Sequence, residues 1–220
     1  HASLAYYYLY YERDWQAAET EFRKAIELNP SYATAHDWYG VYLTARGRWS
    51  EALAEMEKAR ELDPLSLPIS TDVGFSLYYS GNYDAAIKSL QATLAKEPGF
   101  PLAHLWLGRA YEEKGMYPEA VAEFEKVQKS LPGWPVAIAA TGWVYGRSGR
   151  KDDAHRILAE LKAQSKKRYV SAYAIGLVHA GLGEKDEALR LLNLGLKERT
   201  NWMVWTAVDP RWQPIRSDKR

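Results

Sequence analysis

Histidines and paired carboxylates are the side chains of this sequence best suited to catalysis or metal binding, but their spacing supports neither. His155 and His179 each lack a second histidine four residues away and an acidic residue at a metal-ligand spacing. Asp152 and Asp153 fit the first turn of a helix, where negative charge is favoured, better than a catalytic acid pair. The sequence contains no phosphate-binding loop, nucleophile motif or zinc signature. We therefore expect a protein that is not an enzyme and that uses neither a metal nor a cofactor.

The charged residues are nearly balanced, with 29 basic and 28 acidic side chains and a net charge of +1. This balance gives no general reason to expect nucleic acid or an anionic membrane as a partner. A basic run between Arg147 and Arg168 could contact nucleic acid, but a solvated outer face is the favoured interpretation. The chain has no cysteine, no apolar run of membrane-span length and no signal-peptide pattern. We expect a soluble, cytoplasmic protein, and the start at His1 instead of Met suggests a piece of a longer polypeptide.

The elements that would position any site recur with a period of 34 residues. Within Pro101 to Pro132, apolar residues at helical spacing lie on both sides of the bend at Lys114-Gly115, so each period predicts two helices and a turn. A fixed period of this length is typical of a solenoid. The residues that recur in phase are Gly40, Gly74, Gly108, Gly142 and Gly176, then Gly47, Gly81, Gly115, Gly149 and Gly183, then Ala18, Ala52, Ala86, Ala120, Ala154 and Ala188, and finally Pro30, Pro64, Pro98 and Pro132.

This pattern resembles the tetratricopeptide repeat, which favours Trp, Leu, Gly, Tyr, Ala, Phe, Ala and Pro at positions 4, 7, 8, 11, 20, 24, 27 and 32 of each unit. The resemblance implies an all-α fold, an α-solenoid in which about six helix-turn-helix units form a right-handed superhelix. We expect the glycine at position 8 and the alanine at position 20 to lie where the two helices cross. His36 and His104 replace Trp at position 4 and are expected to pack between helices. In the reference unit the eight positions hold His104, Leu107, Gly108, Tyr111, Ala120, Phe124, Val127 and Pro132.

The period predicts a solenoid over residues 1–200, followed by a cap and tail over residues 201–220. Pro210 falls where a seventh unit would need glycine, so the last segment cannot complete a unit. We expect Trp202, Trp205 and Val208 to cover the exposed face of the sixth unit, because the end repeats of a solenoid have no neighbour. The six units span about 1–32, 33–66, 67–100, 101–134, 135–168 and 169–200.

Longer stretches resemble the C-terminal repeat regions of large bacterial regulatory proteins. These stretches are YATAHDWYGVYLTARGRWSEAL, ELDPLSLPISTDVGFSLYYSGNYDAAI, KRYVSAYAIGLVHAGLGEKDEAL and VDPRWQPIRSD. In such proteins the repeats commonly follow a winged-helix DNA-binding domain, a serine/threonine kinase domain or a nucleotide cyclase domain. The resemblance implies a regulatory module of a larger protein.

In each unit, positions 4, 7, 8 and 11 of the first helix pack against the second helix, so the opposite side of the first helix is not covered by it. Positions 2, 5, 9, 12 and 13 lie roughly opposite, because successive residues turn by about 100°. In tetratricopeptide proteins this side lines the concave surface that usually binds peptides. The candidate peptide-binding residues are Tyr7, Tyr10, Tyr11, Asp37, Val41, Thr44, Phe75, Tyr78, Tyr79, Leu105, Arg109, Glu112, Trp143, Arg147 and Tyr173.

The aromatic lining suits an extended or helical peptide held by aromatic anchors, with Asp37, Arg109 and the pair Glu112-Glu113 setting its register. We therefore expect a protein or peptide partner for a non-catalytic interaction scaffold. The same aromatic side chains could instead only fill the gaps between neighbouring first helices. Self-association through the Tyr-rich and Trp-rich ends, giving a weak homo-oligomer, is a second hypothesis. An enzyme with a site of unfamiliar pattern is a third.

Overall fold

The computed structural model describes residues 1–216, and the chain divides into two compact units, unit 1 (His1–Trp106) and unit 2 (Leu107–Arg220). Within residues 1–216 every regular element is helical, so the predicted all-α fold class is confirmed. The boundary between the units falls inside one helix, α7 (Pro101–Glu113). The last two residues of the stretch VDPRWQPIRSD lie outside the described residues.

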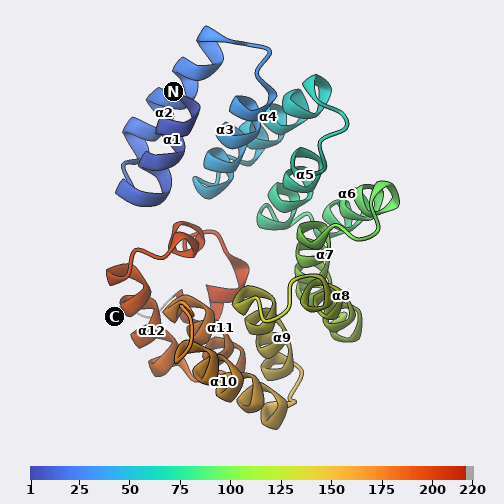
Figure 1. Ribbon diagram of the computed structural model, residues 1–220, viewed down its shortest axis with the longest axis vertical. Coiled ribbons are helices and arrows are strands. Elements are labelled where there is room, and N and C mark those ends of the chain that lie inside the picture. Colours follow the sequence, from blue (N-terminus) through green and yellow to red (C-terminus); the bar gives the residue numbers. More distant parts are fainter. Residues whose placement is uncertain (217–220) are drawn as a thin grey trace. The chain divides into compact units, whose positions relative to one another are not determined.

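Unit 1 consists of successive helical hairpins (Figure 1). The two helices of each hairpin pack on each other, and α1 contacts α3 as α3 contacts α5. We call the side formed by these first helices the first-helix face of unit 1. The elements of unit 1 are α1 (Ala2–Tyr7), a π-helical turn η1 (Tyr8–Glu12), α2 (Trp15–Leu28), α3 (Ala33–Ala45), α4 (Trp49–Leu62), α5 (Leu67–Tyr79), α6 (Tyr83–Lys96) and the start of α7.

Unit 2 repeats the same hairpin and ends in a segment that departs from it. Its first-helix face is formed by the end of α7, α9 and α11, and α9 packs closely on α11. We call residues 201–216 the C-terminal segment. The elements after α7 are α8 (Tyr117–Ser130), α9 (Pro135–Arg147), α10 (Lys151–Ser165), α11 (Ala172–Leu182), α12 (Lys185–Lys197), the 3-10 turns η2 (Asn201–Trp205) and η3 (Pro210–Trp212), and α13 (Gln213–Arg216).

The small residues in phase with the period lie at the helix crossings, as predicted. A Cβ added at Gly74 would lie 2.5 Å from Cγ of Leu90, so a larger residue would force either the Leu90 side chain or the spacing of α5 and α6 to change. The turn position between the helices carries a positive φ, for example 71° at Gly47. In the first repeat Arg13 takes this position with a φ of 57°, which the period alone did not reveal. The in-phase alanines are all buried, namely Ala18, Ala52, Ala86, Ala120, Ala154 and Ala188.

Two glycines outside the period set the contact between α9 and α11. A Cβ at Gly181 would lie 2.6 Å from the carbonyl oxygen of Trp143, and one at Gly146 would lie 2.5 Å from the carbonyl carbon of Gly181. Both distances are far shorter than van der Waals contact, and the opposing atoms belong to the backbone. The two helices therefore approach as closely as they do only because these positions lack side chains.

Candidate functional site

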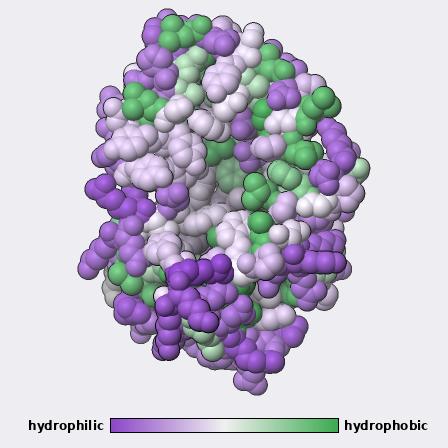
Figure 2. Space-filling model, viewed as in Figure 1, coloured by the Kyte–Doolittle hydropathy of each residue, from purple (hydrophilic) through white to green (hydrophobic). Residues whose placement is uncertain are grey.

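The first-helix face of unit 1 carries an aromatic cluster on α1 and η1. The ring of Tyr6 lies 4.4 Å from that of Tyr10 and 5.0 Å from that of Trp38. Tyr7 stacks on Tyr11 with ring centroids 5.6 Å apart, and these two side chains are 45% and 53% exposed. Side chains of near-neutral hydropathy gather over α1 (Figure 2). Exposed, rigid aromatic rings of this kind are typical of recognition surfaces.

Asp37 lies on the same face, on α3, and is only 4% exposed. Its Oδ1 atom accepts no hydrogen bond from the described residues. Burial raises the pKa of Asp37 from 3.8 to about 7. On α5, burial and the nearby charge of Asp37 raise the pKa of Asp72 as well. The two carboxyl groups form an environment that would favour an incoming cation, because a cation would offset the cost of their burial.

Three further predicted residues, Phe75, Tyr78 and Tyr79 on α5, are buried against Trp106 of α7. The ring of Phe75 meets that of Trp106 edge to face at 4.7 Å, and the ring of Tyr78 lies 5.6 Å from it. In this arrangement they fill the gap between adjacent first helices, the structural role that the sequence left open. Their part in binding a ligand stays a prediction.

Thr44 is likewise a packing residue in this structure. Its hydroxyl donates to the carbonyl of Gly40 at 2.9 Å and lies 2.9 Å from the hydroxyl of Ser76, which ties α3 to α5.

The remaining candidate residues differ in solvent exposure. Leu105 and Trp143 are buried, Val41 is partly exposed, and Arg147 is exposed with its guanidinium 5.7 Å from the ring of Trp143.

In unit 2 the predicted residue Tyr173 contacts the C-terminal segment. Its hydroxyl donates to Oδ2 of Asp209 at 2.9 Å and accepts a hydrogen bond from the indole of Trp212 at 3.0 Å. Asp209 also accepts two hydrogen bonds from the guanidinium of Arg211, at 2.9 and 2.6 Å. All four side chains are buried. The end of the chain therefore inserts its polar and aromatic side chains into the first-helix face of unit 2.

Arg109 and Glu112, on α7, meet the same segment. Nε of Arg211 lies 3.7 Å from Oε1 of Glu112, and the guanidinium of Arg109 lies 4.9 Å from the ring of Trp202. Burial raises the pKa of Glu112, although Arg211 and Arg109 oppose the shift. Burial also raises the pKa of the adjacent Glu113 to about 7. For Asp209 the balance is reversed, because Arg211 and Arg109 outweigh burial and lower its pKa.

The predicted cap is present in part. Trp205 is buried with Met203 and Val204, and η2 packs on α12. The sequence did not predict that Asp209, Arg211 and Trp212 would reach the first-helix face. Pro210 marked the break in the period but gave no indication of where the following residues pack.

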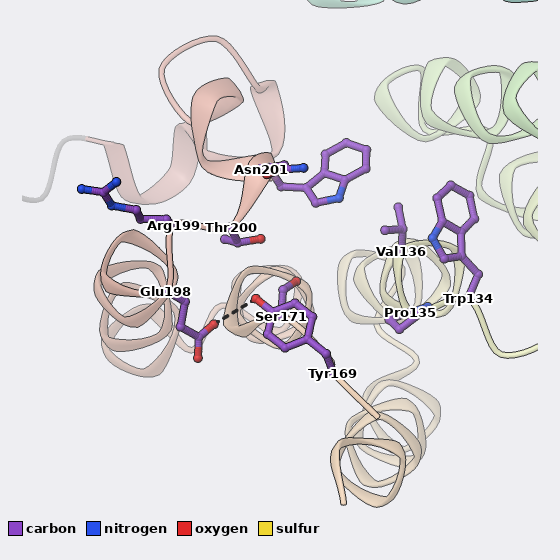
Figure 3. A pocket seen from close by; sticks show the side chains of 10 residues that line it. Trp134, Pro135, Val136, Tyr169, Ser171, Glu198, Arg199, Thr200 and Asn201 are labelled. Carbon is purple, nitrogen blue, oxygen red and sulfur yellow. Dashed lines mark hydrogen bonds between the residues drawn. The ribbon is translucent and has the colours of Figure 1, made fainter. Parts of the chain in front are cut away.

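A pocket of about 500 Å³ opens on unit 2 beside the C-terminal segment. In Figure 3, Trp134, Pro135 and Val136 at the start of α9 lie on one side, and Thr200 and Asn201 lie on the other. Tyr169 donates a hydrogen bond to Oε2 of Glu198 at 3.3 Å at its edge (Figure 3). Two tryptophans and a tyrosine give the opening an aromatic lining suited to a side chain of a bound peptide. The lining residues are Trp134, Pro135, Val136, Tyr169, Ser171, Glu198, Arg199, Thr200, Asn201 and Trp202.

The histidines have structural roles. His36 and His104 are buried, as predicted, and the Nε2 atom of each donates to the carbonyl oxygen of a proline, Pro30 at 2.9 Å and Pro98 at 2.8 Å. His155 and His179 do have an acidic neighbour that their spacing did not predict, because Nδ1 of His179 lies 2.5 Å and Nε2 of His155 3.4 Å from Glu184. Among residues 1–216 no group of three or more acidic or histidine side chains is placed to hold a metal ion.

The helical hairpins, the small residues at their crossings and the positive-φ turns define a protein of the helical-repeat class. The family model of the tetratricopeptide repeat matches residues 7–66 and 74–135. These matches cover more than half of the chain, which therefore belongs to the tetratricopeptide repeat family. No helix in the described part of the chain is both long and apolar enough to cross a membrane.

Solved structures of other tetratricopeptide proteins share the fold. PilW, a type IV pilus biogenesis factor, has 17% sequence identity to this chain, and its structure superposes with a TM-score of 0.68. The match covers 97% of this chain and 96% of PilW. TTC0263 of Thermus thermophilus is 21% identical with a TM-score of 0.61, over 75% and 90%. YrrB, described as having an unusual peptide-binding site, is 20% identical with a TM-score of 0.50, over 88% and 90%. No curated protein matches the sequence.

Proposed function

We propose that this chain is a non-catalytic scaffold that binds a peptide or protein segment on the first-helix faces of its repeats. One observation carries the proposal: in unit 2, predicted binding residues already hold a short segment of polypeptide, with Tyr173 hydrogen-bonded to it and Glu112 beside its arginine. Tetratricopeptide folds generally serve protein interaction, and the description of YrrB as a peptide-binding protein agrees with this use.

In unit 1 the same function would rest on exposed aromatic anchors and on a buried acid of the same first-helix face. Tyr7 and Tyr11 offer a stacked, solvent-exposed surface, and Asp37 favours a basic side chain of the partner. A lysine or arginine of the partner would be attracted by the carboxylate, and its apolar neighbour would pack on the exposed rings. The preferred ligand of unit 1 is therefore a segment with a basic residue next to an apolar one.

We further propose that this chain is part of a large bacterial regulatory protein in the cytoplasm. The stretches that resemble the repeat regions of winged-helix, kinase and cyclase regulators support it. In such a protein the repeats would sense a partner and control an attached domain.

Self-association is the second candidate function, because large apolar side chains are exposed at the start of unit 1, including Leu4, Tyr7 and Tyr11. Analytical ultracentrifugation over a range of concentrations separates the two functions. A chain that stays monomeric at every concentration would exclude self-association as the main role.

The scaffold function is tested by affinity capture from a bacterial lysate, followed by mass spectrometry and by titration of peptides from each captured protein. A Tyr7→Ser, Tyr11→Ser variant should lose the partner, because it loses exposed aromatic area without disturbing buried residues. Tyr32→Ser is the matched control, since Tyr32 is also exposed but precedes α3. If both variants and the unaltered chain capture the same amount of the partner protein, the first-helix face of unit 1 does not bind it.

A further inference from the structure

Residues 209–216, which we call the inserted segment, contact the first-helix face of unit 2 as a bound peptide would. Its side chains hydrogen-bond to Tyr173 and within the segment, and Arg216 donates to the backbone carbonyls of Asp209 at 2.6 Å and of Thr206 at 3.3 Å. Asp209 and Arg211 are fully buried as a bidentate pair. The segment thus carries its own counter-ion into the site, which lowers the cost of burying its guanidinium.

The fit between this segment and α7 is incomplete. Glu112 is 2% exposed, yet neither carboxylate oxygen accepts a hydrogen bond from the described residues. Nε of Arg211 stops 3.7 Å from Oε1, beyond hydrogen-bonding distance. A guanidinium placed nearer to Glu112 would satisfy both oxygens with a forked pair of hydrogen bonds. The site therefore has acceptor capacity that the inserted segment leaves unused.

The inserted segment is tied to the rest of the C-terminal segment by hydrogen bonds from the N–H of Asp209 to the carbonyl of Trp205 at 2.8 Å and from Arg216 to the carbonyl of Thr206 at 3.3 Å, and its departure would break them. Met203, Val204 and Trp205 are buried and cover α12, whereas Ala207, between the cap and the inserted segment, is exposed. The inserted segment contains only the short turn η3 and the four-residue helix α13. Its departure would leave the repeat helices and the covered end of α12 in place.

We propose that the first-helix face of unit 2 binds a partner segment in which an arginine is followed by an aromatic residue, and that residues 209–216 occupy this site as an internal ligand until the partner replaces them. The inference rests on the proposed scaffold function and specifies the ligand chemistry of unit 2. The arginine would pair with Glu112, and the aromatic side chain would take the place of Trp212 against Tyr173.

The experiment uses the full chain with a protease recognition sequence inserted after Ala207 and cut only after folding. The probe is a fluorescently labelled peptide with the sequence of residues 208–216, and binding is followed by polarisation. The cut chain is expected to bind the probe and the uncut chain is not, because the tethered segment competes at high effective concentration. A probe with Arg211→Lys should bind at least about tenfold more weakly, since lysine cannot form the forked pair that Arg211 makes with Asp209 while it faces Glu112.

A cut chain that remains folded by circular dichroism but never takes up the probe would overturn the inference, and so would a cut chain that unfolds. In either case the segment would be a permanent part of the fold. Uncut Trp212→Ala, with its internal ligand weakened, should bind the probe more tightly than the unaltered chain, and no increase would contradict the inference. Probe binding that requires a dimer in ultracentrifugation would assign the site to a second copy instead. Lysate capture that depends on Tyr7 and Tyr11 tests the scaffold function separately, because it does not use unit 2.

Discussion

Replacing Asp37 by asparagine should stabilise the protein at alkaline pH while weakening partner binding. Asp37 is buried and its Oδ1 atom accepts no hydrogen bond from the described residues, so burial raises the pKa of its carboxyl group to about 7. A carboxyl group with a raised pKa stabilises the folded state fully below its ordinary pKa of 3.8, and this contribution is lost as the pH rises through about 7. Asparagine has nearly the same shape and no charge, so it removes that loss.

The size of the effect follows from the shift. A difference of about 3 pKa units corresponds to an upper bound of about 4 kcal/mol. Asparagine keeps a buried polar group, so we expect a gain of about 1–3 kcal/mol in the free energy of unfolding near pH 8. Near pH 4 the gain should fall to about 0.5 kcal/mol, because the folded-state carboxyl group is then protonated and pH 4 lies so close to the ordinary pKa of 3.8 that ionisation favours the unfolded state only slightly.

The measurement is urea unfolding followed by circular dichroism at several pH values between these limits. Asp63→Asn is the matched control, because Asp63 is an exposed aspartate of the same unit. Capture of the lysate partner should fall in Asp37→Asn and remain in Asp63→Asn. If Asp37→Asn is less stable than the unaltered chain near pH 8, the carboxylate has a favourable partner and the reasoning is wrong.

Two matched pairs test the packing argument. A Cβ at Gly181 meets the backbone of α9 at 2.6 Å, whereas a Cβ at Gly40 meets the flexible side chain of Met56 at the same distance and the nearest backbone atom, the carbonyl oxygen of Ala52, only at 3.1 Å. Urea unfolding should therefore show a loss of about 1–3 kcal/mol or more for Gly181→Ala and less than about 1 kcal/mol for Gly40→Ala, and equal losses would refute the distinction. In the same assay, His104→Leu should lower the free energy of unfolding by about 1–2 kcal/mol, because it leaves the carbonyl of Pro98 without its donor. The exposed control, His155→Leu, should leave the free energy of unfolding almost unchanged. Similar losses for the two histidine variants would mean that this hydrogen bond contributes little.

The period of 34 residues was sufficient to predict the hairpins, because each in-phase glycine or alanine has the same steric reason in every repeat. It could not predict Arg13, since a positive φ at a residue other than glycine leaves no signature in the sequence. It also missed Gly146 and Gly181, although two extra glycines within neighbouring first helices were a visible signal of close backbone approach.

The candidate site was harder to predict for a physical reason. Helical geometry assigns residues to the first-helix side, but whether they are exposed depends on how closely the adjacent first helices pack. Phe75 and Tyr78 are buried for this reason, while Tyr7 and Tyr11 remain exposed. The packing of residues 209–216 on the first-helix face could not be predicted, because periodicity carries no information once the repeat is broken. The charges of Arg109 and Glu112 at inner positions were the one signal that a charged segment would be accommodated there.

The two first-helix faces deal with a buried acid in different ways. In unit 2, Arg211 and Arg109 oppose the effect of burial on Glu112, although burial still holds the pKa of this acid well above its ordinary value. In unit 1, burial raises the pKa of Asp37, and no basic group of the described residues lowers it. A basic side chain of a partner would therefore gain more at Asp37, where it meets no internal competitor, than at Glu112, where it must first displace Arg211. Under the two proposals, unit 1 would bind in the resting chain and unit 2 only after its internal ligand has left, so cutting after Ala207 should change binding at unit 2 alone.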